Sequence, residues 1–363
     1  MMNAYVLLVA LVLIAALIMH GTQEGNKKYV IFACILLFVI YGLRDTFVIG
    51  NDSSTSYLVS FRRMRNYSFS EVLLRGDTFN QGYWVLNKIF YDVTGGDYQF
   101  FITSVSIFVT ICFGRMIYQY SPNPLASILL HFGLLFFTFH FSALKQSIAM
   151  AFLMLAFEYI VKGKPVRFVV TALVASWFHF PSIVFLPAYW IAKLKIGRSY
   201  LLFLAGLLSI VYIFRNDIIN FMFDMYRGED SNVDLSNVQF FRTKAIIMAL
   251  IVIVAVLLRK PQRDDHVYSI LLGYMGLAIV FQTFCGYNNI FERLADYYFQ
   301  FSVIFIPMIF DKSANRHPLL NWRFVEIIDT FALPVFCCYG IYRFLSVTLN
   351  DAMLSPYKFF FQS

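Results

Sequence analysis

The chain consists of long apolar runs separated by short polar breaks. A helix that spans a membrane needs about 20 mostly apolar residues. Strands of a membrane barrel alternate apolar and polar residues, whereas these runs are apolar throughout. Because unpaired backbone groups cannot face lipid, the pattern predicts transmembrane helices. They are expected at about residues 4–20, 29–43, 98–119, 124–140, 144–161, 166–179, 182–193, 200–215, 241–258, 267–285, 293–310 and 325–347.

The runs at 166–179 and 182–193 are short for spans, and Pro181 between them breaks a helix. They are either two half-length helices that meet in the membrane or one kinked span with a re-entrant piece. Two crossings place all basic clusters on one side, as the positive-inside rule requires of cytoplasmic loops. These clusters are Lys27 and Lys28; Lys162, Lys164 and Arg167; Lys193, Lys195 and Arg198; Arg259, Lys260 and Arg263; and Lys312, Arg316 and Arg323. We therefore expect an all-α, polytopic transmembrane bundle of about 11–12 spans with both termini outside.

Residues 1–363 are interpreted as a single integral membrane domain with two long outer connections, at 44–97 and 216–240. The first connection has apolar residues at helical spacing, which is typical of interfacial helices on a membrane surface. The expected apolar face consists of Tyr57, Leu58, Phe61 and Met64. A second short helix is expected at 83–90.

Composition narrows the class of protein further. Of the 363 residues, 60% are hydrophobic and 14% are charged, against roughly 25% charged in soluble domains. The net charge of +8 falls in small clusters between the runs, which argues against nucleic-acid binding. The five cysteines have no metal-ligand or redox spacing, and there is no phosphate-binding Gly-Lys-Ser/Thr loop and no His-Glu-x-x-His motif.

Four polar groups stand at the outer ends of expected spans. They are Arg44-Asp45 with Gly50-Asn51-Asp52, Lys145-Gln146, His179, and Glu292-Arg293. A charge at bilayer depth costs roughly 2.5–3.5 kcal/mol, so it is usually paired or lines a wet cavity. Taken singly, each group has a structural explanation: a helix end, a turn, a snorkelling lysine or a local ion pair. Taken together on one membrane face, they predict a shared cationic cavity.

Such a cavity suits a phosphate or pyrophosphate, because arginine offers planar, bidentate donors to phosphate oxygens. Further positive potential comes from Arg62, Arg63, Arg65 and Arg75. A lipid pyrophosphate at the outer leaflet fits this arrangement. Asp52 or Asp45 would then act as a general base on an acceptor hydroxyl while the cations stabilise a departing pyrophosphate. His131 and His140 are assigned to helix packing.

The order of short motifs resembles the EpsG-like branch of the Wzy polysaccharide polymerases. The motifs are Gly42-Leu43-Arg44, Gly50-Asn51-Asp52 and Tyr57; Gly82-Tyr83-Trp84-Val85-Leu86-Asn87; Leu144-Lys145-Gln146-Ser147-Ile148-Ala149; Phe178-His179-Phe180-Pro181 with Pro187; and Arg293 with Tyr297 and Tyr298. They extend over about residues 40–310. Two positions depart from the family pattern: Lys145 replaces the usual Arg, and Asn51 replaces the usual Thr.

The resemblance implies a glycosyltransferase-type polymerase at the outer face of the bacterial cytoplasmic (inner) membrane. A glycan on polyprenyl pyrophosphate would be passed to a new lipid-linked repeat unit, giving capsule, O-antigen or exopolysaccharide. Arg44, Lys145 and Arg293 would hold the pyrophosphate, and Asp52 and His179 would handle protons. The expected substrate-binding residues are Asp45, Tyr57, Tyr83, Gln146, Glu292 and Tyr297. No metal or nucleotide cofactor is implied, because the donor is already activated.

The implied partners are the polyprenyl-pyrophosphate-linked glycan and membrane lipid, with a chain-length regulator and a flippase as candidate protein partners and no nucleic acid. Three alternatives stay open. In a flippase or transporter for lipid-linked oligosaccharide, polar residues would be expected across the full depth of the bundle. A membrane O-acyltransferase would centre on His179 or His140. A structural membrane subunit is the third.

Overall fold

The computed structural model describes residues 3–19, 21–50, 52–74, 80–194, 200–218, 220, 243–259, 265–287, 289–311 and 322–362. Nearly all of the second outer connection, 216–240, lies outside these ranges. Outside them too are Asn51, Arg75, Lys195, Arg198, Lys260, Arg263, Lys312 and Arg316.

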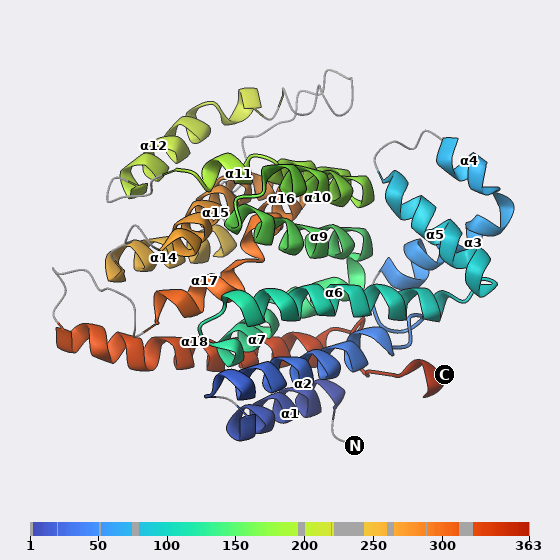
Figure 1. Cartoon of the computed structure of the whole chain (residues 1–363), viewed down its shortest axis with the longest axis horizontal. Coiled ribbons are helices and arrows are strands. Elements are labelled where there is room, and N and C mark those ends of the chain that lie inside the picture. Colours follow the sequence, from blue (N-terminus) through green and yellow to red (C-terminus); the bar gives the residue numbers. More distant parts are fainter. Residues whose placement is uncertain are drawn as a thin grey trace.

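Every predicted apolar run contains helix, so the predicted all-α bundle is confirmed. The helices are α1 (Ala4–Met19), α2 (Gln23–Gly42), α6 (Tyr98–Tyr120), α7 (Pro124–Gly133), α8 (Phe136–Ser142), α9 (Leu144–Val161), α10 (Pro165–Phe178), α11 (Ala188–Ile191), α12 (Tyr200–Ile213), α14 (Thr243–Leu258), α15 (His266–Thr283), α16 (Asn289–Phe299), α17 (Ser302–Ile309) and α18 (Trp322–Asn350). Figure 1 shows α2, α6, α9 and α18 running along the long axis of the molecule. An isolated β-bridge joins Arg44 and Phe359.

Within the described parts of the chain, five helical segments are long and apolar enough to cross a membrane: α2, α6, α9, His266–Gly286 and Glu326–Asn350. The pair α7 and α8 adds a sixth if it is counted as one span bent by 52°. Shorter apolar helices of 10–17 residues fill several of the other predicted runs. The chain is therefore a multi-pass membrane protein, and the total of 11–12 crossings stays a prediction.

The break expected at Pro181 is present. Helix α10 ends at Phe178, and Pro181 lies in a 3-10 turn (Phe180–Phe185) that leads to the single helical turn α11. The ring of Pro181 removes a backbone donor, so the α-helix cannot continue through it.

The run at 124–140 was expected to form one helix, and this is wrong. It forms α7 and α8, joined through Leu135, whose φ of 64° is left-handed. At the break, a Cβ on Gly340 of α18 would lie only 3.1 Å from Gly133 Cα, so the two helices touch through their backbones. Arg343 Nη1 also donates to the Gly133 carbonyl at 2.9 Å. A neighbour far along the chain therefore ends α7 at this point.

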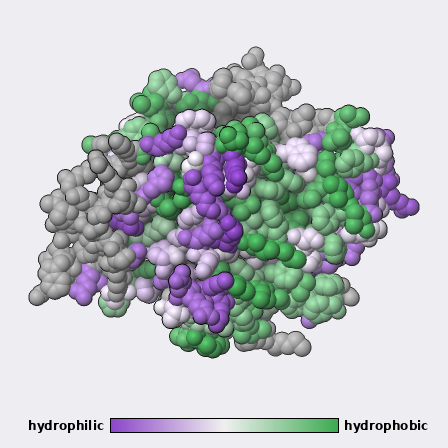
Figure 2. Space-filling model, viewed as in Figure 1, coloured by the Kyte–Doolittle hydropathy of each residue, from purple (hydrophilic) through white to green (hydrophobic). Residues whose placement is uncertain are grey.

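The first outer connection folds into short helices: the π-helical turn η1 (Ser53–Tyr57), α3 (Leu58–Arg63), the 3-10 turn η2 (Met64–Asn66), α4 (Phe69–Leu74) and α5 (Gln81–Thr94). Of the expected apolar face, Leu58, Phe61 and Met64 are buried within the protein and Tyr57 is partly buried; that these helices lie on the membrane surface stays a prediction. Hydrophilic residues gather at the right-hand end of Figure 2, where Figure 1 places α3, α4 and α5, and an apolar zone lies beside them.

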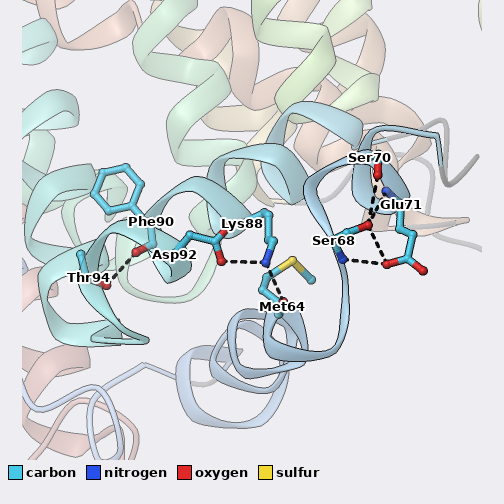
Figure 3. Close-up of polar contacts among 8 residues, drawn as sticks. All are labelled: Met64, Ser68, Ser70, Glu71, Lys88, Phe90, Asp92 and Thr94. Atoms are coloured by element: carbon cyan, nitrogen blue, oxygen red, sulfur yellow. Dashed lines mark hydrogen bonds and ion pairs between the residues drawn. The ribbon is translucent and has the colours of Figure 1, made fainter.

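Local polar contacts hold these outer helices in place (Figure 3). Ser68 and Glu71 form a capping box at the start of α4: Ser68 N donates to Glu71 Oε2 at 2.7 Å, and Glu71 N donates to Ser68 Oγ at 3.2 Å. Lys88 Nζ lies 2.6 Å from Asp92 Oδ1 and donates to the Met64 carbonyl at 3.3 Å, which ties α5 to η2.

The C-terminal segment after α18 packs against the chain that follows α2. Asp45 N donates to Lys358 O at 2.9 Å, and Phe360 N donates to Leu43 O at 3.0 Å. Gly50 N donates to Met353 O at 3.0 Å. Residues 353–360, here called the C-terminal strap, therefore hold the segment that contains Arg44 and leads to Asp52.

Candidate functional site

A cavity of about 1080 Å³ lies where η1, the α7–α8 break, α14, α16, α18 and the C-terminal strap meet. Its charged lining residues are Asp52, Lys244, Glu292, Arg293, Asp296, Arg343 and Asp351. The expected cationic cavity therefore has a mixed lining, with three basic and four acidic side chains. Phe136, Phe139, Phe299, Phe336 and Tyr339 supply aromatic walls.

One face of α16 supplies the centre of the cavity. Four residues of this helix line the cavity: Glu292, Arg293, Asp296 and Phe299. Arg293, Asp296 and Phe299 follow one another at intervals of three residues, which places them on the same side of the helix. The side chain of Arg293 is exposed to the cavity and makes no ion pair with any described residue. Gln146 Nε2 donates to the Arg293 carbonyl at 3.2 Å, which joins the start of α9 to α16. Arg293 is thus positioned through its backbone, and its guanidinium faces the cavity.

Lys244 of α14 neutralises two of the carboxylates. Its Nζ lies 2.9 Å from Glu292 Oε1 and 2.8 Å from Asp296 Oδ1. Sequence reasoning missed both Lys244 and Asp296. The available signal was an ionisable residue within each of the apolar runs at 241–258 and 293–310, since such residues usually face a bundle interior or cavity.

Two more charged groups that the sequence did not single out line the cavity: Arg343 on α18, and Asp351 directly after the end of that helix. Arg343 is committed in part to the Gly133 carbonyl. Asp351 Oδ1 accepts from Met353 N at 2.8 Å and so stabilises the turn into the C-terminal strap. Arg343 was detectable as a lone basic residue within the apolar run at 325–347.

Asp52 and Tyr57 approach the cavity from the outer connection. Burial raises the pKa of the Tyr57 phenol to about 12, and the carboxylate of Asp52 adds to this shift. Arg293 and the backbone N–H groups of Lys145 and Leu144 oppose it. Tyr57 therefore lies among Asp52, Arg293 and the start of α9, and three of the predicted polar groups converge at one end of the bundle.

The sequence model of one protein family matches residues 4–359, almost the whole chain, and that family is described as the EpsG family. The chain belongs to the EpsG family. EpsG-like proteins are Wzy-type polymerases, so membership indicates a polysaccharide-polymerase-type role. No significant match was found among curated proteins or among solved structures.

In this EpsG-family chain, Lys145 contacts the outer helices. Its Nζ lies 5.0 Å from the ring centroid of Tyr83 and 5.4 Å from that of Trp84, both on α5. The rings of Tyr83 and Tyr57 meet edge to face at 5.8 Å. The described lining of the cavity does not include Lys145, which lies behind Tyr57 instead.

Arg44 is the most enclosed of the predicted cations, with 1% of its surface exposed. It donates to the Tyr41 carbonyl, and its Nη2 donates to the Phe141 carbonyl at 3.3 Å. Its guanidinium also lies 5.0 Å from the Phe141 ring centroid. Phe141 precedes Ser142 and Ala143, which line the cavity, so Arg44 supports the cavity wall from behind.

Asp45 faces a second, smaller pocket of about 280 Å³, which Arg62, Asp97 and Gln99 also line. Its carboxylate accepts from Phe47 N at 2.9 Å. The structure therefore separates Asp45 from Asp52, although the two are close in sequence.

His179 and Tyr297 pair with each other through a hydrogen bond between Nδ1 and the phenol. Both side chains are buried, and the positive charges of Arg293 and Lys145 act on the imidazole. Neither residue belongs to the described lining of the cavity. Among the described residues, no group of three or more His, Cys, Asp or Glu is arranged to hold a metal ion.

Proposed function

We propose that this EpsG-family protein polymerises polyprenyl-pyrophosphate-linked oligosaccharide repeat units into surface polysaccharide, at the outer face of the bacterial cytoplasmic membrane. One observation carries the proposal: Arg293, without an ion pair among the described residues, faces a large cavity that it shares with several carboxylates. An unpaired guanidinium suits a diphosphate, and carboxylates suit the hydroxyl groups of a sugar.

The position of the cavity suits a substrate whose lipid stays in the bilayer. Ile247 of α14 and Tyr339 of α18 both line the cavity, and they are 36% and 59% exposed. Val335 and Tyr342, near Tyr339 on α18, are exposed as well. Helix α14 packs on α15 and α17, whereas α18 packs on α7 and α1. These exposed apolar side chains on α14 and α18 would give a polyprenyl chain a surface along which to extend from the cavity into lipid.

In the proposed reaction, Arg293 binds the diphosphate of the donor. Lys145 and Arg44 add positive potential from the adjoining ends of α9 and α2. When the bond between the anomeric carbon and the diphosphate breaks, the electron pair leaves with the diphosphate, and these fixed positive charges stabilise the negative charge that develops. The bond between the sugar and the diphosphate supplies the activation, so the proposed transfer has no nucleotide step.

A specific observation weighs against the acyltransferase alternative. His140 Nδ1 is bonded to Ser147 Oγ at 2.8 Å within the core, and His179 is bonded to Tyr297. Neither imidazole is part of the described cavity lining, where an acyl acceptor would have to lie. The experiment in the next paragraph distinguishes a flippase from a polymerase.

The test is the size distribution of surface polysaccharide in cells with and without this gene, complemented by Arg293→Ala. Loss of the gene, or R293A at normal protein level, should collapse the ladder to single repeat units. The matched control is Arg167→Gln, because Arg167 is exposed at the start of α10, outside the cavity. Loss of every surface repeat would instead indicate a flippase, and an unchanged ladder with altered acetyl content would indicate an acyltransferase.

A further inference from the structure

Asp296 is the most enclosed of the four carboxylates in the cavity. Its side chain is 8% exposed, against 40% for that of Glu292. Its Oδ1 accepts from Lys244 Nζ at 2.8 Å. No described residue donates to its other oxygen, and Asp296 lines the cavity. Asp296 therefore has one carboxylate oxygen fixed by Lys244 and a second oxygen that no described residue occupies.

Asp296 also lies at a useful distance from Arg293. The two residues are three positions apart on α16, and such pairs have Cβ atoms about 5–6 Å apart on one helix face. A diphosphate bound by Arg293 would thus stand beside the carboxylate of Asp296, in the cavity that both residues line.

We infer that Asp296 is the catalytic base that takes the proton from the acceptor hydroxyl. The inference rests on the proposed function. The O–H bond of the acceptor breaks, and its proton goes to the free oxygen of Asp296. The acceptor oxygen bonds to the anomeric carbon of the donor, while the bond from that carbon to the diphosphate breaks. Lys244 holds Asp296 in place through its contact with Oδ1.

The other carboxylates in the cavity fit this task less well. Asp351 is used by the turn into the C-terminal strap, and Glu292 is more open to water. Asp52, which the sequence predicts for this role, makes no ion pair with any described residue, so none of the described cations fixes its orientation. A carboxylate already fixed by an ammonium needs less reorganisation as the reaction proceeds.

The test uses purified full-length protein in lipid nanodiscs, with lipid-linked repeat units extracted from cells that lack this gene. Elongation rate and substrate binding are measured for the wild type, Asp296→Asn and Asp52→Asn. D296N should lower the rate at least about 100-fold with binding retained, as expected for loss of a general base. The control is Asp92→Asn, which removes the carboxylate of the 2.6 Å Lys88–Asp92 pair outside the cavity (Figure 3) and should leave the rate unchanged.

The outcomes separate the two proposals. Wild-type protein that binds the substrate and never elongates it overturns the proposed function, and the role of Asp296 with it. Elongation that survives in D296N above a tenth of the wild-type rate overturns the role of Asp296 alone. So does a loss of elongation in D52N that D296N does not share.

A second measurement distinguishes a base from a merely structural ion pair. In Lys244→Gln, the acidic limb of the rate–pH profile should move to higher pH by at least about one unit, because the carboxylate loses its adjacent ammonium. The other charged groups around Asp296 are Glu292 and Arg293 on α16, and Asp52, Arg343 and Asp351 across the cavity. Lys88→Gln, the matched control, should leave the limb in place. If the elongation rate of K244Q falls equally at every pH, the inference is overturned. This measurement decides the matter even if the D296N protein cannot be recovered from membranes.

Discussion

Gly133 and Gly340 bring α7 and α18 into direct backbone contact at the edge of the cavity. A Cβ added to Gly340 would lie 3.1 Å from Gly133 Cα, and one added to Gly133 would overlap the backbone of Gly340. Because backbone atoms face each other, no flexible side chain can move aside. The contact fixes the place where Arg343 meets the Gly133 carbonyl and where α7 gives way to α8.

Gly133→Ala is therefore expected to destabilise the protein by about 1–3 kcal/mol or more, the usual cost of overpacking. The thermal unfolding temperature in detergent checks this. The matched control is Gly206→Ala on α12, where an added Cβ meets nothing within 4 Å. G206A should be neutral or slightly stabilising, since Ala favours helix over Gly. Equal melting of the two variants would contradict the packing argument.

Lys145→Arg is expected to keep activity, because a guanidinium can still lie over the rings of Tyr83 and Trp84. Lys145→Gln should shorten the polysaccharide, since the positive charge beside Tyr57 is lost. The ladder of chain lengths is the measurement. If K145Q gave wild-type lengths, the charge of Lys145 would have no part in the transfer.

Removal of residues 353–363 is expected to lower polymerase activity more than about tenfold. The C-terminal strap supplies backbone hydrogen bonds to Leu43, Asp45 and Gly50, each contributing about 0.5–1.5 kcal/mol. Without them the segment leading to Asp52 loses its support, and Met353 and Leu354 leave the cavity wall. Membrane yield and chain-length profile are measured together. Phe361→Ala, which changes an exposed side chain, should behave as wild type.

Tyr57 predicts a dependence of stability on alkaline pH. Its folded pKa of about 12 lies above the ordinary 10.0, so the folded state holds this proton more tightly than the unfolded state does. The stabilisation is complete below about pH 10 and is lost as the pH rises towards 12. Between pH 9 and 11.5, the unfolding temperature of Tyr57→Phe should therefore fall less than that of the wild type. Parallel curves would show that Tyr57 ionises normally in the folded protein.

The class of fold and several residues of the site can be predicted from the amino-acid sequence alone. Membrane-spanning helices depend on the apolar content of about 20 consecutive residues, which is a local property. The break at Pro181 is local as well, because the proline ring alone removes the donor. Three of the cavity residues could be predicted from the sequence: Asp52, Glu292 and Arg293. A charge at the end of a span is costly unless it is paired or lines a wet cavity, which makes such residues candidates for a site.

Only the tertiary structure decided which of these charges share a cavity. Lys244 and Asp296 are 52 residues apart and meet because α14 and α16 lie close together. The α7–α8 break depends on Gly340 and Arg343, more than 200 residues further along the chain. Likewise, Arg44 and Asp45 are adjacent in sequence, yet Arg44 is enclosed behind the cavity wall and Asp45 faces another pocket. Contacts between distant helices depend on the packing of whole surfaces, and no local run of residues specifies that packing.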